Sequence, residues 1–168
     1  MNANDTLQKF FDLFGKSDPI SILLTKAGRR WESAALPETI KPGLLGRCYP
    51  QSRLLAKRHP KKYFYVEGYA CHEDYSVPIH HAWCSDRSGR VVDNTWHSPE
   101  RAVYVGVAFK HSVFDEKLPH FCDWGLLRSP EFLKRVLENP ERYIDMDWYR
   151  ADEPLGTKYT NADKLKSC

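Results

Sequence analysis

The middle of this 168-residue chain holds four short runs of aromatic and β-branched residues, separated by turn residues. The runs cover residues 63–70, 78–84, 91–93 and 103–109. Such residues favour strands, and the turn at 86–90 is short enough to join the second and third runs as a hairpin. The pattern predicts an antiparallel sheet. Glu67 interrupts the first run, and we expect it on a solvent-facing side of that sheet.

Helix-start and helix-end signals predict four helices around the strand region. They begin at Asp5-Thr6, at Ser17-Asp18-Pro19, at Cys48-Tyr49-Pro50 and at Ser129-Pro130-Glu131. Residues 26–45 are rich in Gly and Pro, so we expect mostly loop there. The order predicts an α+β fold in which the N-terminal helices and the helix from Cys48 pack on an antiparallel sheet. The length suits one domain over residues 1–152, followed by a polar tail over 153–168.

Composition limits the class of function. The net charge of +3 is too small to indicate a nucleic-acid-binding protein, which usually carries a concentrated basic face. No run is long and apolar enough to span a bilayer, and the N-terminal residues lack the pattern of a secretory signal. The five cysteines are odd in number and irregularly spaced, so we expect free thiols in a cytoplasmic protein. No pattern predicts a cofactor or indicates the oligomeric state.

One of these cysteines, Cys48, stands where a helix is expected to begin. The thiolate is the nucleophilic form of a cysteine, and the free N–H groups and dipole of a helix start favour that form. Gly46, two residues earlier, would allow the backbone to approach a substrate closely. Cys48 is therefore a candidate nucleophile, although a lone cysteine is more often a small buried hydrophobe.

A cysteine nucleophile also needs a base and a group that orients the base. Two adjacent histidines, His80 and His81, lie on one expected strand and Asp93 on the next, so a His–Asp pair could form across the hairpin. Neighbouring side chains of a strand point to opposite faces, so only one histidine shares a face with Asp93. We favour His81 as the base and keep His80 as the alternative.

Four segments together resemble the core of transglutaminase-like proteins, which belong to the wider group of papain-like cysteine enzymes. They are Gly46-Arg47-Cys48, Tyr65-Val66-Glu67-Gly68-Tyr69, His81-Ala82-Trp83 and Val91-Val92-Asp93-Asn94-Thr95-Trp96. The resemblance covers residues 44–109. It implies a papain-like α+β core with Cys48 as nucleophile, His81 as base and Asp93 as orienting acid. Two features differ from the family: Asn94 stands where Pro is common, and the spacing from Cys48 to His81 is short, as in small bacterial and phage proteins of this kind.

Such a site implies attack on an amide or ester carbonyl and an acyl-enzyme, so we expect a cysteine hydrolase (a peptidase or amidase) or an acyltransferase. The expected partner is a protein, peptide or other amide substrate, and neither a membrane nor a nucleic acid. The backbone N–H of Cys48 would hold the oxyanion, with Gln51 as a candidate second donor. Trp83, Asn94 and Trp96 are the other candidate substrate contacts, although each Trp could equally fill the core.

Three other interpretations stay open. The same fold with an unused site would make the chain an interaction module, for example a host-directed protein of a phage or pathogen. The basic stretch over residues 53–62 could contact phosphate groups, but such a stretch is more often a solvated helix face. His80, Cys84, His120 and Cys122 offer ligands for zinc, but without the spacing of a zinc finger.

Overall fold

The computed structural model describes residues 2–114 and 124–145. Within these residues the chain has an α+β fold with one antiparallel sheet, as the order of patterns predicts. The helices are α1 (Ala3–Phe14), α2 (Pro19–Ala27), α3 (Cys48–Arg58), α4 (Pro130–Glu138) and α5 (Pro140–Tyr143), with 3-10 turns η1 (Pro99–Arg101), η2 (His111–Phe114) and η3 (Leu126–Arg128). The strands are β1 (Arg29–Trp31), β2 (Tyr63–His72), β3 (Ile79–Asp86), β4 (Val91–Val92) and β5 (Ala102–Phe109). The predicted tail over 153–168 lies outside the described residues.

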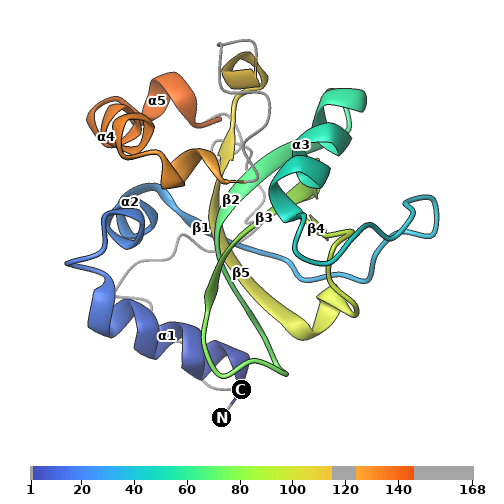
Figure 1. The fold of residues 1–168 in the computed structure, drawn as a ribbon, viewed down its shortest axis with the longest axis horizontal. Coiled ribbons are helices and arrows are strands. Elements are labelled where there is room, and N and C mark those ends of the chain that lie inside the picture. Colours follow the sequence, from blue (N-terminus) through green and yellow to red (C-terminus); the bar gives the residue numbers. More distant parts are fainter. Residues whose placement is uncertain (1, 115–123, 146–168) are drawn as a thin grey trace.

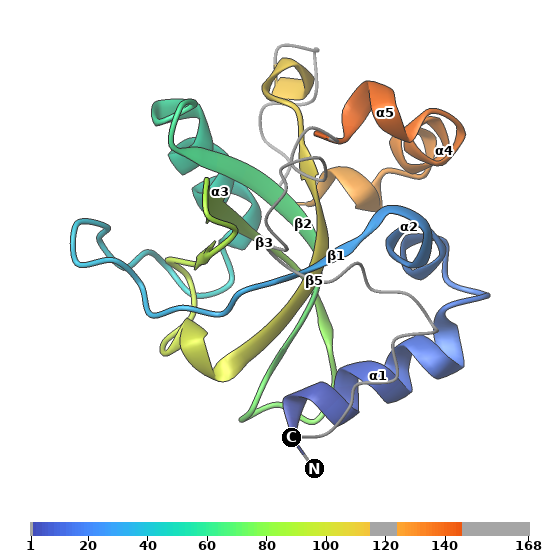
Figure 2. The ribbon, with the colours of Figure 1, turned by 180° about the vertical axis from the view of Figure 1, so that it is seen from behind.

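The sheet has the strand order β1-β5-β2-β3-β4, and every neighbouring pair is antiparallel. The central strand β2 pairs with both β3 and β5, and all of its residues are buried. In both views α3 lies on the side of β3 and β4, whereas α1, α2, α4 and α5 lie on the other side (Figures 1 and 2). The helices α3 and α1 therefore pack over different strands of the sheet, α3 over β3 and β2 and α1 over β2 and β5, and both contribute side chains to one core.

Capping residues explain where most of the helices begin. Asn2 caps α1, because its side chain accepts the N–H of Asp5, so this helix starts before the predicted position. Asp18 caps α2 and Ser129 caps α4, and in both helices a proline occupies the first turn, as predicted. None of the helices in the described part combines the length and the apolar character needed to cross a membrane.

Alternating side chains of β2 enter two different cores. Positions such as Tyr65 and Cys71 join the larger core, which contains the buried side chains of the helices. Positions such as Val66 and Ala70 join a smaller core on the other face of the sheet. Aromatic residues dominate this second core: Trp31, Trp83, Trp96 and Tyr104. Neighbouring residues of one strand therefore meet very different surroundings.

Two parts of the sheet differ from the prediction. The strand β1 falls in the stretch expected to be loop, and it pairs with β5 over only three residues. The predicted hairpin forms, with Cys84 opposite Val92, but β4 ends at Val92. Asp93 therefore follows the strand and does not lie on it. The conformation of the next loop, and not strand pairing, sets the position of the Asp93 carboxylate.

Candidate active site

Helix α3 begins at Cys48, as predicted, and this residue lines a cleft of about 560 Å³. Tyr49, His81 and Arg128 also line this cleft. The backbone N–H groups of Cys48 and Tyr49 have no backbone acceptor among the described residues, as is usual at a helix start. Two backbone donors therefore lie next to the thiol. Such donors can hold an anion or a developing negative charge.

The loop before α3 is fixed by Gln51 and Asn94. Its Gly46 has a φ of 80°, a conformation that glycine adopts without strain. The N–H of Gly43 donates to the carbonyl oxygen of Asn94 at 2.6 Å. The amide nitrogen of Gln51 donates to the carbonyl oxygen of Leu44 at 3.2 Å. Gln51 and Asn94, which sequence reasoning placed against the substrate, do not line the described cleft; their hydrogen bonds instead fix the loop that leads to Cys48.

A short hydrogen bond joins His81 to Asp93. The distance from Nε2 of His81 to Oδ2 of Asp93 is 2.7 Å, and both side chains are almost fully buried. This bond occupies Nε2, and the side chain of His81 also forms a hydrogen bond with Cys48, which lines the same cleft. The structure thus brings together the three residues that the sequence singled out.

Three further donors hold the Asp93 carboxylate in place. The backbone N–H and the hydroxyl of Thr95 donate to its Oδ1 at 2.9 and 2.8 Å. The hydroxyl of Tyr104 donates to its Oδ2 at 3.1 Å. Sequence reasoning gave neither residue a role. An Asp followed two residues later by Thr is a known turn signal and could have revealed Thr95, but Tyr104 comes from the distant strand β5.

The surroundings shift the pKa values of His81 and Asp93 in opposite directions. Burial alone would lower the pKa of His81, but the Asp93 carboxylate and Cys48 outweigh burial and raise it to about 9. Burial would raise the pKa of Asp93, but the charge and hydrogen bond of His81, with help from Thr95, hold it below its ordinary value. Both shifts favour an ion pair between the His81 imidazolium and the Asp93 carboxylate.

Aromatic rings fix the plane of the His81 imidazole. Trp96 stacks on it with ring centroids 4.3 Å apart and planes 20° apart. Trp83 lies farther along the same stack, at 6.2 Å, and is fully buried. Of these two candidate substrate contacts, Trp96 lines the cleft, whereas Trp83 belongs to the core and offers no surface to a substrate.

The adjacent residue His80 points to the opposite face of β3. Its Nδ1 lies 2.8 Å from the hydroxyl of Tyr49, which also donates to the His80 carbonyl oxygen at 3.0 Å. Burial, with the charges of Arg128 and His81 acting in the same direction, lowers the pKa of His80 to about 3. His80 is therefore neutral. It does not contact Asp93, so the geometry favours His81 as the base.

Glu67 corrects the expectation of a solvent-facing carboxylate, because its side chain is fully buried on the helix-covered face of the sheet. Its carboxylate accepts the hydroxyl of Tyr65 at 2.6 Å and the backbone N–H groups of Leu126 and Leu127 at 2.6 and 3.0 Å. Burial raises the pKa of Glu67, and these three donors oppose that rise. Glu67 thus holds the segment of η3 against β2.

The alternative sites have little support in the described part of the chain. No group of three His, Cys, Asp or Glu side chains there is arranged to hold a metal ion, and His120 and Cys122 lie outside the described residues. In the basic stretch, the guanidinium of Arg53 lies 5.8 Å above the ring of Tyr65 and does not face outward with its neighbours. The remaining cations of that stretch are exposed.

Comparisons of this chain with protein-family models, with curated proteins and with solved structures find no match. What supports a function is therefore the arrangement of Cys48, His81 and Asp93 and the chemistry of these groups.

Proposed function

We propose that this protein is a cysteine-dependent hydrolase or acyltransferase with a papain-like, transglutaminase-like core, which acts on an amide or ester carbonyl. The observation that carries the proposal is the arrangement of three groups. One ring nitrogen of His81 is bound to Asp93 at 2.7 Å, and His81 lines the same cleft as Cys48, the first residue of α3. Asp93 and Cys48 together favour the charged form of the ring and raise its pKa against the effect of burial. An imidazolium beside a cysteine at a helix start favours the thiolate, which is the reactive form.

In the proposed reaction the Cys48 thiolate attacks the carbonyl carbon and forms a C–S bond. The oxygen becomes an oxyanion, which the backbone N–H groups of Cys48 and Tyr49 can hold. The bond from carbon to the leaving nitrogen or oxygen then breaks, and the imidazolium of His81 gives its proton to the leaving group. Neutral His81 next takes a proton from water or an amine, which attacks the thioester and releases Cys48.

Alkylation by iodoacetamide tests the reactive thiolate without knowledge of the substrate. The reagent should modify Cys48 at pH 7 about tenfold or more faster than it modifies the other cysteines, with the sites and rates read by mass spectrometry. The variant His81→Ala should lose this advantage. Cys71 and Cys84 serve as internal controls, because both are fully buried and burial raises the pKa of each thiol.

If Cys48 reacts no faster than these controls, Cys48 is not an activated nucleophile, and the proposed enzymatic activity is excluded. The interaction module would then be the better account of the fold. Retention of full biological activity by Cys48→Ala would point to the same conclusion.

A further inference from the structure

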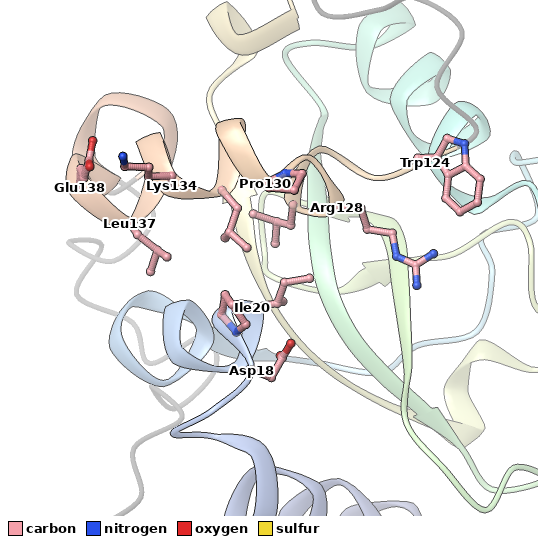
Figure 3. Close-up of a pocket in the computed structure, with 11 residues that line it drawn as sticks. Asp18, Ile20, Trp124, Arg128, Pro130, Lys134, Leu137 and Glu138 are labelled. Carbon is pink, nitrogen blue, oxygen red and sulfur yellow. The ribbon is translucent and has the colours of Figure 1, made fainter.

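A second and larger hollow, of about 810 Å³, lies between α2 and α4. Apolar side chains line most of its wall, including Ile20, Leu127, Leu133 and Leu137. Figure 3 shows Trp124 and Arg128 together at one end of this groove and Leu137 and Glu138 at the other. A groove of this size and character suits an apolar chain or side chain.

Arg128 belongs to both hollows, because it lines the groove and also the cleft that contains Cys48. The two hollows are therefore neighbours that share this residue in their walls. A substrate that lies at Cys48 and also occupies the groove has to pass the Arg128 side chain. The Trp124 ring lies 5.7 Å from that guanidinium and forms part of the groove wall.

The charge of Arg128 has no acidic partner among the described residues. Two of the acids that line the hollows, Asp18 and Asp74, have other hydrogen-bond partners. Asp18 accepts hydrogen bonds from Ser21 and the hydroxyl of Tyr69, and Asp74 pairs with Arg101 at 3.1 Å. An exposed guanidinium with a planar set of donors is well suited to bind a carboxylate.

The backbone that carries Arg128 is firmly held. Glu67 accepts the N–H groups of the two preceding residues, Leu126 and Leu127. Gly125 packs so closely that an added Cβ would lie 2.5 Å from the Glu67 carboxylate and 2.6 Å from the Tyr49 ring. The buried carboxylate thus positions the Arg128 segment against Tyr49, the residue next to the nucleophile.

We propose that the acyl substrate of the Cys48 site carries a carboxylate that Arg128 binds and an apolar group that enters the groove between α2 and α4. An acidic peptide with an apolar side chain has this chemistry. The inference rests on the proposed function for the identity of the reacting thiol. It adds the substrate class, with Arg128 as the specificity-determining residue and Glu67 as its positioning residue.

Paired alkylating reagents test the carboxylate half of the proposal. Iodoacetate and iodoacetamide share the reacting carbon and the leaving group and differ in charge, so the ratio of their rates at Cys48, relative to glutathione, reports anion recognition. Arg128→Gln should lower this ratio about three- to tenfold at low salt, and any effect of the substitution on the thiol itself cancels because both reagents react with the same thiol. Arg135→Gln is the matched control, because Arg135 is an exposed arginine of α4 that lines neither hollow.

Neutral reagents of different length test the groove half. N-octylmaleimide should modify Cys48 about tenfold faster than N-ethylmaleimide does, relative to glutathione, because the longer chain is buried in the groove. Leu137→Gln should remove this preference. Leu13→Gln, at a position of α1 that is 73 % exposed, should keep it.

The outcomes separate this inference from the proposed function. An unchanged iodoacetate ratio in Arg128→Gln overturns the carboxylate contact, and an unchanged chain-length preference in Leu137→Gln overturns the groove. Both results are independent of whether Cys48 is activated, which the iodoacetamide rate of the wild-type protein and of His81→Ala decides alone.

Discussion

At the scale of single residues, Asp93 is the group on which the charge of His81 depends. Burial disfavours the imidazolium, and the carboxylate reverses that effect. Asp93→Asn keeps the shape of the side chain and removes the charge. We expect the pKa of His81 to fall from about 9 to its ordinary value of 6.5 or below, measured by NMR titration of the imidazole, and the alkylation of Cys48 at pH 7 to slow about tenfold or more.

Tyr104→Phe is the matched control for this change, because it removes one of the donors to Asp93 and leaves the charge in place. In this variant the pKa of His81 should stay above 6.5. A His81 that still titrates near 9 in Asp93→Asn would mean that another group holds the proton on the ring.

At the scale of elements, the loop into α3 depends on the backbone of Gly46. Its φ of 80° is costly for any other residue, although a Cβ there would meet no atom within 4 Å. Gly46→Ala should therefore lower the free energy of unfolding by about 1–2 kcal/mol and slow the alkylation of Cys48. Urea denaturation and iodoacetamide labelling measure the two effects.

Gly106 of β5 provides the contrast. A Cβ there would lie 2.5 Å from the carbonyl oxygen of Glu67 and 2.7 Å from the Trp83 ring. Gly106→Ala should cost about 3 kcal/mol of stability through this overlap. A Gly46→Ala protein with unchanged stability would show that the loop can adopt another conformation.

The elements with strong local signals were the ones that the sequence could predict. Capping residues, prolines and aromatic runs predicted α2, α3, α4 and the hairpin of β3 and β4, and all four are confirmed. The strand β1 has three residues, two of them arginines, and its pairing with β5 leaves no periodic pattern. The end of β4 before Asp93 could not be predicted from the sequence either, because the ends of strands depend on tertiary packing.

At the scale of the whole molecule, two buried histidines make stability depend on pH in opposite directions. The pKa of His81 is raised to about 9, so its contribution is complete below 6.5 and is lost as the pH rises through 9. The pKa of His80 is lowered to about 3, so its contribution is complete above 6.5 and is lost as the pH falls toward 3. The protein should be most stable near pH 6.5, measured by urea denaturation between pH 4 and 9.5.

His80→Gln separates the two effects, because glutamine does not titrate. Its stability should fall less steeply than that of the wild-type protein between pH 6.5 and 4, and as steeply above pH 6.5. An equally steep loss on the acid side would assign that loss to other groups.

The candidate site was easier to anticipate than its surroundings. Cys48, His81 and Asp93 lie within 46 residues of sequence, on segments with recognisable local patterns. Several of the groups around them come from farther away. The two backbone donors to Glu67 lie 59 and 60 residues along the chain, and Arg128, which lines the cleft, belongs to the same distant segment. Contacts between residues so distant in the chain leave no pattern in the local sequence, so the buried position of Glu67 could not be predicted.

The opposite orientations of the His80 and His81 side chains limit where the chain can accept an insertion. The pKa values of these two consecutive residues are shifted in opposite directions, because only His81 faces Asp93, whereas His80 is buried on the other face of the sheet. A one-residue slip in the pairing of β3 would move the His81 side chain to the other face of the sheet, away from Asp93 and the thiol. Insertions within β3 should therefore abolish reactivity even where the fold survives, whereas insertions in the exposed turn at 87–88 should be tolerated.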